Sequence, residues 1–509
     1  MTTETSDTRS KRARRDHRIG VLDIGSNSIR LVVYDHEGLS PIPVFNEKAL
    51  CGLGRGLDET GALSVEAMGS ALTNLQRFAS IAGAMRVGRV DVLATSAVRD
   101  ASNGPDFVAE IERRTGYTVQ IIGGDEEARL SALGVVSGFP DADGVVGDLG
   151  GGSLELIDVA DQQLGAHTTM PVGPLRIGEV EPSKRRKMEA LVDGYLDGAP
   201  WLVNLEGRTL YAVGGAWRSV AKAHMAAVNY PIEVIHGYTI DRATLSDFLS
   251  TLALQSKKSI RATPGVSRRR ADTMATAALV LQRVLGRGKP DRVVFSAFGL
   301  REGCIFDRLP AEERHQDPLL VAAVSIARET NRFAPPAETV FNWLKPLFGD
   351  FARRDERLVR ALCMLSDMAW AEHPSYRGEH AFLRISRLPV AGLDHADRVF
   401  LGLGMLARYS GHVQLEAARK VEGLLDPERR QLAVQVGLAL RLGLTLSGGA
   451  TALLRRTRIE SRDDGFALTV APEAVVLMGE VVERRVQSLS DALQRPVVLS
   501  VRPGRNGKR

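Results

Sequence analysis

The sequence predicts an α/β protein with two similar halves, a helical region behind them and a small α+β appendage at the end. Three observations lead to this prediction. Before Leu309, segments with the residue alternation of strands follow in turn with segments of helical period. This order is typical of an α/β fold with mixed sheets. The segment "DIGSNS" at 23–28 returns in similar form as "DLGGGS" at 148–153. Beyond Leu309 nearly every apolar pattern has helical period.

The first half opens on two β-rich runs within 18–35, joined by a short Gly/Ser/Asn turn that is typical of a hairpin. Strand and helix patterns then alternate. They predict a helix at 65–85, a strand and its turn at 89–103, a helix at 105–116, a strand at 117–124 and a helix at 125–136.

The hairpin pattern restarts at 144–159, and strands and helices follow as far as 291–303. We therefore expect two domains of similar construction, offset along the chain. The predicted divisions are a disordered basic tail at 1–17, domains at 18–140 and 141–310, a helical domain at 311–455 and a small α+β appendage at 456–509.

Composition narrows the class of protein. The chain has 509 residues and a formal net charge of +5. Six basic and three acidic residues within 1–18 supply +3 of this, so the rest of the chain gives little reason to expect a nucleic-acid partner. Three widely spaced cysteines fit a reducing cytoplasm and form no metal-binding pattern. The longest apolar stretch, 432–446, is too short for a membrane span, and we expect a buried helix there.

The repeated hairpin turn places a carboxylate and several backbone N–H groups around one spot. Glycine lets a ligand approach the backbone closely, and successive N–H groups form an anion-binding concavity. A single copy is more often an ordinary hairpin, since these residues suit such turns anyway, but two copies favour a phosphate clamp. The candidate phosphate-binding residues are Asp23, Gly25, Ser26, Asn27, Ser28 and Arg30 in the first copy and Gly150, Gly151, Gly152 and Ser153 in the second.

Four ordered motifs, "DIGSNSIRLVV", "ATSAVRDASN", "GDEEARLSALGV" and "GDLGGGSLEL", resemble the exopolyphosphatase and guanosine pentaphosphate phosphohydrolase family. That family belongs to the actin, sugar kinase and heat-shock chaperone superfamily. The resemblance covers residues 19 to about 308. It implies two ribonuclease-H-like domains that form a cleft, with hydrolysis of a terminal phosphoanhydride there.

The resemblance also implies a catalytic glutamate in "GGDEEARL". Asp125 is expected to cap a helix whose first turn holds Glu126 and Glu127. Acidic residues are common in a first turn, because the helix dipole favours them. The alignment with the family favours Glu127 as the catalytic residue, with Glu126 as a supporting one.

Further site residues are expected in the neighbouring motifs. Arg99 follows a strand and is expected on a turn with Thr95 and Ser96, where its guanidinium can fork onto phosphate oxygens or form a surface salt bridge. Glu155 lies on an apolar strand two residues past Ser153, and together with Asp148 it is suited to hold Mg²⁺ or to orient the attacking water. Hard oxygen ligands without a Cys or His cluster favour that ion.

Other segments are more ambiguous. In "YAVGGAWRSVAK", Gly214 and Gly215 are most simply a tight turn that opens a helix, although related kinases touch adenosine with the corresponding region. Two basic segments, 183–187 and 257–270, are candidates for the path of a polyanion, although charge runs are usually solvated faces.

The helical region is similar to the His-Asp metal-dependent phosphohydrolases but departs from their signature. Ser366 and Asp367 stand where the His-Asp pair would be, while His380 and His412 remain nearby without a full set of ligands. A metal site without its central histidine is not expected to work. We expect this region to be structural, a dimer contact or part of the substrate path.

The leading hypothesis is a cytoplasmic, homodimeric, Mg²⁺-dependent exopolyphosphatase that releases orthophosphate from inorganic polyphosphate, without a membrane partner. The alternative substrate is guanosine pentaphosphate, since the motifs for attack are shared. A different class is an ATP-binding kinase or switch that uses the same clamp. A nucleic-acid binder recruited by the basic tail is the least favoured hypothesis.

Overall fold

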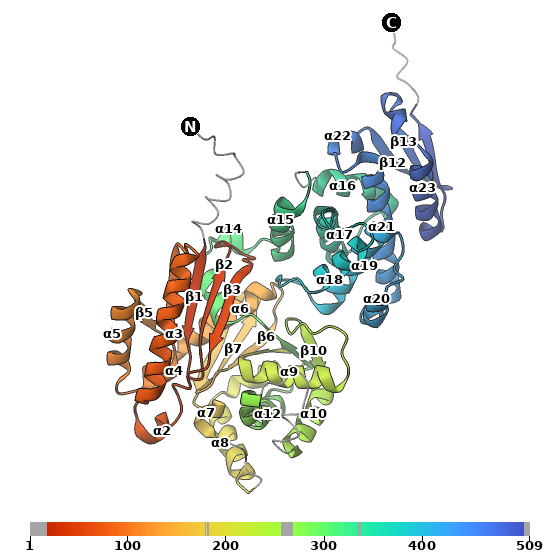
Figure 1. Cartoon of the computed structure of the whole chain (residues 1–509). Helices are drawn as coiled ribbons and strands as arrows, with labels where there is room; N and C mark the ends of the chain where they lie inside the picture. The colour runs from red at the N-terminus through yellow and green to blue at the C-terminus, as the bar shows by residue number, and fades with distance from the viewer. Residues whose placement is uncertain (1–17, 179, 181–182, 256–267, 334–336, 503–509) are drawn as a thin grey trace, which may run out of the picture. The chain divides into compact units, whose positions relative to one another are not determined.

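The computed structural model describes residues 18–178, 180, 183–255, 268–333 and 337–502 (Figure 1). It divides the chain into two compact units, Met1–Gln316 and Asp317–Arg509. The basic tail predicted at 1–17 lies outside the described residues, as does the segment 257–267 of the second basic stretch. The finer division into ribonuclease-H-like domains stays a prediction.

The first sheet of unit 1 has five strands in the order β3-β2-β1-β4-β5. Strand β1 pairs antiparallel with β2, which confirms the first predicted hairpin, and parallel with β4. Nearly every residue of β1 is buried, as expected for a central strand. The bounds are β1 Ile19–Ile24, β2 Ile29–Tyr34, β3 Pro43–Ala49, β4 Arg89–Ala94, β5 Val119–Ile121, α2 Leu57–Thr60, α3 Val65–Ala84, α4 Ser96–Asp100 and α5 Gly104–Thr115.

The second sheet has six strands in the order β10-β11-β9-β6-β7-β8. Its hairpin β6–β7 is followed by β9, which pairs parallel with β6, so the arrangement around β1 is repeated. The bounds are β6 Gly144–Leu149, β7 Leu154–Ala160, β8 Gln163–Met170, β9 Thr209–Val213, β10 Tyr238–Asp241, β11 Arg292–Phe295, α7 Pro174–Ile177, α8 Arg185–Asp197, α9 Gly215–Ala227, α10 Arg242–Leu254 and α12 Arg268–Gly288.

Helices α6 (Gly124–Gly138) and α13 (Leu300–Phe306) pack closely against each other through glycine. A Cβ on Gly134 would lie 2.0 Å from the carbonyl oxygen of Gly299, and one on Gly303 would lie 1.8 Å from that of Leu130. Neither position tolerates a side chain, because the obstacle is backbone. The tight contact fixes the starts of the two helices, and both starts carry residues of the site described below.

Two local predictions in this unit are wrong. Asp125 does not cap α6: the residue at that position is Gly123, and the Asp125 side chain is 85% exposed. Asp125 therefore lies inside the first turn with Glu126 and Glu127. The segment after β4 is the short helix α4 rather than a turn, with Thr95 before it and Arg99 in its last turn.

Unit 2 is mainly helical at its start and ends with a three-stranded sheet in the order β12-β13-β14. Strand β12 was not predicted, because its charged residues break the apolar alternation. The bounds are α14 Ala311–Arg314 at the end of unit 1, then α15 Pro318–Thr330, α16 Ala337–Leu344, α17 Arg353–Leu365, α18 Arg377–Ser386, α19 His395–Ser410, α20 Glu416–Val421, α21 Pro427–Ser447, α22 Thr451–Leu454, β12 Thr457–Arg462, β13 Gly465–Val470, α23 Glu480–Leu493 and β14 Val497–Val501.

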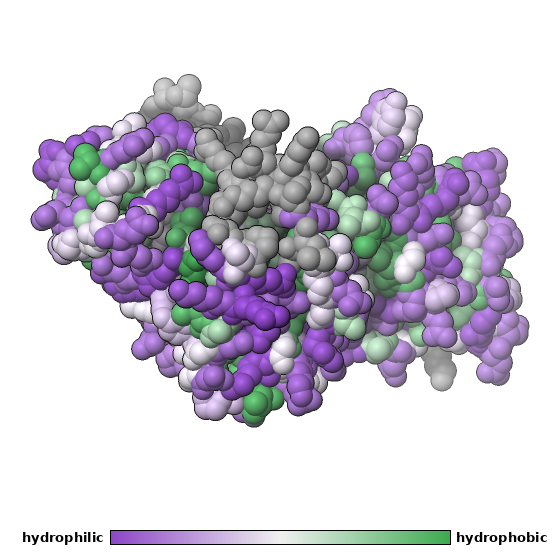
Figure 2. All heavy atoms as spheres, turned by 90° about the horizontal axis from the view of Figure 1, so that it is seen from below, coloured by the Kyte–Doolittle hydropathy of each residue, from purple (hydrophilic) through white to green (hydrophobic). Residues whose placement is uncertain are grey.

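Helix α21 contains the longest apolar stretch of the sequence, and much of it is buried, as predicted. Among the described residues, no helix combines the length and apolar character needed to cross a bilayer. The face drawn in Figure 2 is covered mainly by hydrophilic side chains, with apolar residues scattered among them.

Candidate active site

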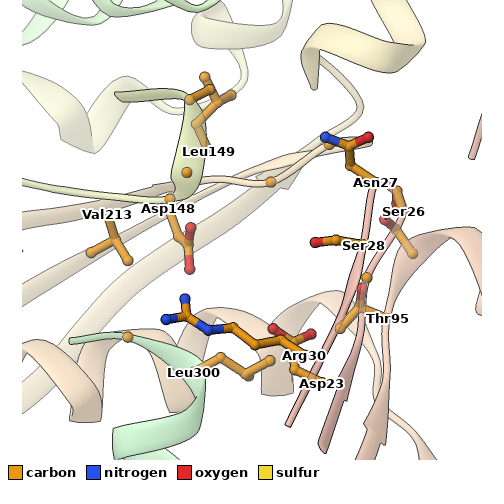
Figure 3. A pocket seen from close by; sticks show the side chains of 18 of the residues that line it. Asp23, Ser26, Asn27, Ser28, Arg30, Thr95, Asp148, Leu149, Val213 and Leu300 are labelled. Atoms are coloured by element: carbon orange, nitrogen blue, oxygen red, sulfur yellow. Dashed lines mark hydrogen bonds between the residues drawn. The ribbon is translucent and has the colours of Figure 1, made fainter. Parts of the chain in front are cut away.

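The two repeated hairpin turns meet at one cavity in unit 1. Its walls include Asp23 at the end of β1 and Asp148 near the end of β6, and the cavity volume is about 160 Å³. Figure 3 shows both carboxylates pointing into this space, with the Ser28 side chain of the first turn pointing into it as well. Carboxylates from strands 125 residues apart in the sequence therefore share one site.

The turns are alike in detail as well as in sequence. In the first, the Gly25 amide donates to the Ser28 carbonyl at 3.0 Å, and in the second the Gly150 amide donates to the Ser153 carbonyl at the same distance. The turns also approach each other, since a Cβ on Gly151 would lie 3.1 Å from the Cβ of Ser26. Small residues are required where two backbones come this close.

Most candidate phosphate-binding residues line this cavity. They are Asp23, Gly25, Ser26, Asn27, Ser28, Arg30, Thr95, Ser96, Gly150 and Gly151. Gly152 and Ser153 lie just behind the lining: a Cβ on Gly152 would lie 2.8 Å from the Ser96 hydroxyl, and Ser153 is buried. The Ser26 and Ser96 hydroxyls are 2.9 Å apart, which joins the first turn to the start of α4.

Glu127 is a wall of the same cavity and is only 8% exposed. Burial, then the charge of Asp148, raises the pKa of Glu127 to about 8. Arg99 opposes this shift: its Nη1 lies 3.4 Å from a Glu127 carboxylate oxygen. Arg99 does not itself line the cavity, and its guanidinium also contacts the Ile122 carbonyl and Asp100.

Glu126 points elsewhere. Its carboxylate accepts two hydrogen bonds from Arg129, at 2.8 and 2.9 Å, and it is absent from the cavity lining. Arg129 also binds Asp307, so Glu126 belongs to an ion-pair network on the outer side of α6. Of the two glutamates, only Glu127 is placed to meet a ligand in the cavity.

Asp148 and Glu155 stand opposite each other on the paired strands β6 and β7. The Ser131 hydroxyl donates to Asp148 at 2.6 Å. Burial raises the pKa of Asp148, while burial and the charges of Glu127 and Asp148 raise the pKa of Glu155 well above its usual range. One oxygen of Glu155 has no hydrogen-bond partner among the described residues. These buried carboxylates repel one another, so a cation would relieve them.

In the described part of the chain, no three His, Cys, Asp or Glu side chains converge closely enough to hold a metal ion by themselves. Mg²⁺ is usually held by one or two carboxylates together with phosphate oxygens and water. Asp148 and Glu155 fit such a partial site.

Sequence reasoning missed several walls of the cavity. Arg301 at the start of α13 is only 9% exposed, and its Nη1 lies 3.1 Å from a carboxylate oxygen of Asp23, 278 residues away. Its neighbour Glu302 accepts a hydrogen bond from Tyr34 on β2 at 2.7 Å. These two contacts join the first sheet to α13. The other lining residues that were not predicted include Lys48, Arg218, Thr273 and Gly299.

The structural interpretation of Gly214 and Gly215 was incomplete. They do form a tight turn that opens α9, but both also line the cavity. The basic segment 183–187 does not line the cavity. It leads into the start of α8, where Arg185 binds Glu189 and Gln282.

Asp367 in unit 2 is held by arginine. Its carboxylate accepts two hydrogen bonds from the Arg332 guanidinium, at 2.8 and 2.9 Å, and buried Arg408 lies 3.8 Å away. His380 contacts Glu372 at 3.0 Å, and His412 accepts a hydrogen bond from the Gln414 amide. Each of these three side chains therefore has a partner in unit 2, and the loss of the metal centre of the His-Asp enzymes stays a prediction.

Two sheets, their matched turns and the carboxylates gathered between them define the class of α/β enzymes that hold phosphate groups in a cleft. The chain belongs to the Ppx/GppA phosphatase family, because the model of that family matches residues 32–312. A second model, that of the exopolyphosphatase C-terminal region, matches residues 324–498.

Individual proteins agree with this assignment. Exopolyphosphatase 1 of Mycobacterium tuberculosis is 29% identical over 315 residues, which cover 58% of this chain and 89% of that protein. Retrograde regulation protein 2 of Saccharomyces cerevisiae is 27% identical over 452 residues, or 77% of this chain and 73% of that protein. The crystal structure of an exopolyphosphatase from Cytophaga hutchinsonii matches with a TM-score of 0.53 and 25% identity, over 58% of this chain and 99% of that one.

Proposed function

We propose that the protein is an exopolyphosphatase, a hydrolase of phosphoanhydrides that releases orthophosphate from the end of inorganic polyphosphate. The observation that carries this proposal is the shared cavity, in which matched turns from two sheets face a buried glutamate. Membership of the Ppx/GppA phosphatase family supports it, as do relatives named exopolyphosphatase.

The reaction assigns each part of the cavity a task. The hairpin turns hold the terminal phosphate through backbone N–H groups and the Ser26 and Ser28 hydroxyls. Glu127 accepts a proton from water as the water oxygen attacks the terminal phosphorus. The bridging P–O bond breaks, and its electron pair leaves with the oxygen of the shortened chain. Arg99 holds the Glu127 carboxylate in place.

A divalent cation fits the remaining carboxylates. We assign Asp148 and Glu155 as the groups that hold Mg²⁺ together with phosphate oxygens and water. When bound, Mg²⁺ neutralises charge that gathers on the phosphate. A cation held there would also lower the pKa of Glu127, since it would oppose the repulsion from Asp148 that contributes to the raised value.

The test compares orthophosphate release from long-chain polyphosphate and from guanosine pentaphosphate, with Mg²⁺ and after treatment with a chelator. We expect faster release from polyphosphate and a loss of activity on chelation that added Mg²⁺ reverses. Hydrolysis of neither substrate, with folded protein in hand, would refute the proposal. Preference for guanosine pentaphosphate would move the assignment to the alternative substrate. Homodimer formation and a cytoplasmic location stay predictions.

A further inference from the structure

The start of α9 forms one end of the cavity. Strand β9 pairs parallel with β6, with Val213 opposite Asp148, so the chain leaves β9 one strand away from the second hairpin turn. The contact is close: a Cβ on Gly214 would lie 2.2 Å from the carbonyl oxygen of Leu149. Helix α9 has 13 residues, and its N-terminal residues Gly215 and Ala216 line the cavity. The positive end of the helix dipole is therefore at the cavity wall.

Arg218, in the first turn of α9, adds a positive charge at the same place. It lines the cavity, and its Nη1 donates to the Ser296 carbonyl at 3.3 Å. Arg218 is close enough to Asp148 for its positive charge to lower the pKa of that carboxyl, although burial, which raises the pKa, has the larger effect. A second cation, Arg301, lines the cavity as well and has a buried Nε without a hydrogen-bond partner among the described residues.

Charge is thus divided along the cavity. On the β7 and α6 side of Asp148, Glu127 lines the cavity, and Glu155 lies behind the lining, paired with Asp148 on β7. On the β9 side, the α9 terminus and Arg218 line the cavity. Water attack and cation binding belong to the acidic side. A polyanion whose end reacts there has its next phosphates stabilised where they extend toward positive charge, and the α9 terminus with Arg218 supplies such charge on the β9 side.

The lining also argues against a nucleoside at this end. Among the described lining residues none is aromatic, so no ring is present to stack on a base. The volume of about 160 Å³ is smaller than the 300 Å³ or more that is usual for sites of drug-sized molecules.

We propose that the N-terminus of α9 and Arg218 form a second phosphate subsite, which binds the phosphate next to the one released. This inference rests on the proposed function and adds a specificity residue to it. A cation that contacts only the second phosphate recognises pyrophosphate and longer chains but not orthophosphate. The subsite therefore favours a chain over its product.

The experiment measures competitive inhibition of polyphosphate hydrolysis by orthophosphate and by pyrophosphate in the full chain and in Arg218→Gln. We expect the inhibition constant for pyrophosphate and the KM for tripolyphosphate to rise about tenfold or more, because a charged hydrogen bond is lost. The inhibition constant for orthophosphate and kcat should change by less than about threefold. Arg218→Lys should recover part of the affinity.

Arg242→Gln is the matched control. Arg242 is exposed at the start of α10, and the pairing of β10 with β11 places it at the opposite end of the sheet from the cavity. It should leave every constant unchanged. A parallel rise for orthophosphate and pyrophosphate in Arg218→Gln, or no rise for either, would overturn the subsite.

A second measurement separates this inference from the proposed function. Calorimetric binding of tripolyphosphate to Glu127→Gln and to the double variant Glu127→Gln/Arg218→Gln needs no turnover. Weaker binding in the double variant supports the subsite even if the wild-type chain hydrolyses no polyphosphate. Equal binding in the two variants counts against it. A thermal melt of each variant checks that the fold is retained.

Discussion

Glu127 combines three properties at the residue scale that a general base for phosphoryl transfer needs: burial, an orienting arginine and a raised pKa. Its neighbour Glu126 shows why the local pattern could not choose between them, so that the choice of Glu127 rested on the resemblance to the family. Successive side chains on a helix point in directions about 100° apart, so one of an adjacent pair faces the cavity and the other faces Arg129. Which one faces inward depends on the rotation of α6, and this is set by its packing on α13.

The first prediction concerns the base. Glu127→Gln should lower kcat by about 10² to 10⁴, because the amide cannot accept the proton, while the affinity for polyphosphate stays nearly the same. Glu126→Gln should keep most of the activity. Steady-state release of orthophosphate measures both. Loss of activity only in Glu126→Gln would exchange the two assignments.

The second prediction follows from the pKa of the same residue. A carboxyl whose pKa rises from 4.5 in the unfolded chain to about 8 in the folded one stabilises the fold below pH 4.5 and loses that contribution as the pH rises through 8. Glu127→Gln has no such loss. With a chelator present, the melting temperature of Glu127→Gln should exceed that of the wild type by roughly 2 °C or more at pH 8.5. The difference between the two proteins should be smaller at pH 6. A difference independent of pH would contradict the assigned pKa.

Among the elements, the two hairpins were fully predictable. Each pattern of Asp, apolar residue, Gly and Ser became a hairpin, and both close with the same Gly-to-Ser hydrogen bond. Helix starts were less predictable, since α6 begins after Gly123 without a side-chain cap. The remaining cavity walls came from elements distant in sequence, such as α9 and α13, and no local pattern marks such a meeting.

The third prediction tests how α9 is placed. Gly214 has φ 96° and ψ 154°, a conformation that is almost restricted to glycine, and a Cβ there would meet the Leu149 carbonyl oxygen at 2.2 Å. Gly214→Ala should cost about 2 to 4 kcal/mol of unfolding free energy and strongly reduce activity. Gly207→Ala is the control, because Gly207 has φ 77° but no atom within 4 Å of a Cβ. It should cost about 1 kcal/mol and leave kcat unchanged.

The fourth prediction concerns Asp367, which stands in the place of the His-Asp signature after the end of α17. Asp367→Asn leaves Arg332 and buried Arg408 without their carboxylate, so it should destabilise unit 2 by about 2 to 4 kcal/mol. Denaturant unfolding measures the effect. Asp350→Asn is the control, because Asp350 is 98% exposed and should have no effect beyond about 0.5 kcal/mol. A variant as stable as the wild type would show that Asp367 has no structural role.

On the scale of the whole molecule, composition and pattern predicted two α/β halves followed by helices and a small α+β end. They could not predict that the helical part and the final sheet form one unit, because that depends on packing between distant segments. Strand β12 was missed for a related reason. Its one apolar residue is Ile459, too few for an alternating pattern, and its pairing with β13 was not visible in the sequence.

The fifth prediction concerns the basic N-terminal segment. Every described residue that lines the cavity falls between Asp23 and Arg301. A chain that begins at residue 18 should therefore hydrolyse polyphosphate with kcat within about twofold of the full chain. Orthophosphate release at two salt concentrations measures this. If activity disappears while the melting temperature is unchanged, the segment takes part in the reaction.

The crowding of like charges around Asp148 has a practical consequence. Carboxylates that repel one another in a cavity are relieved by a divalent cation, and any ligand that binds the folded chain stabilises it by an amount that grows with the logarithm of its concentration over its Kd. Heating the protein with a panel of condensed phosphates and divalent ions would rank its natural ligands by the midpoint of the melt, before any enzymatic assay is set up.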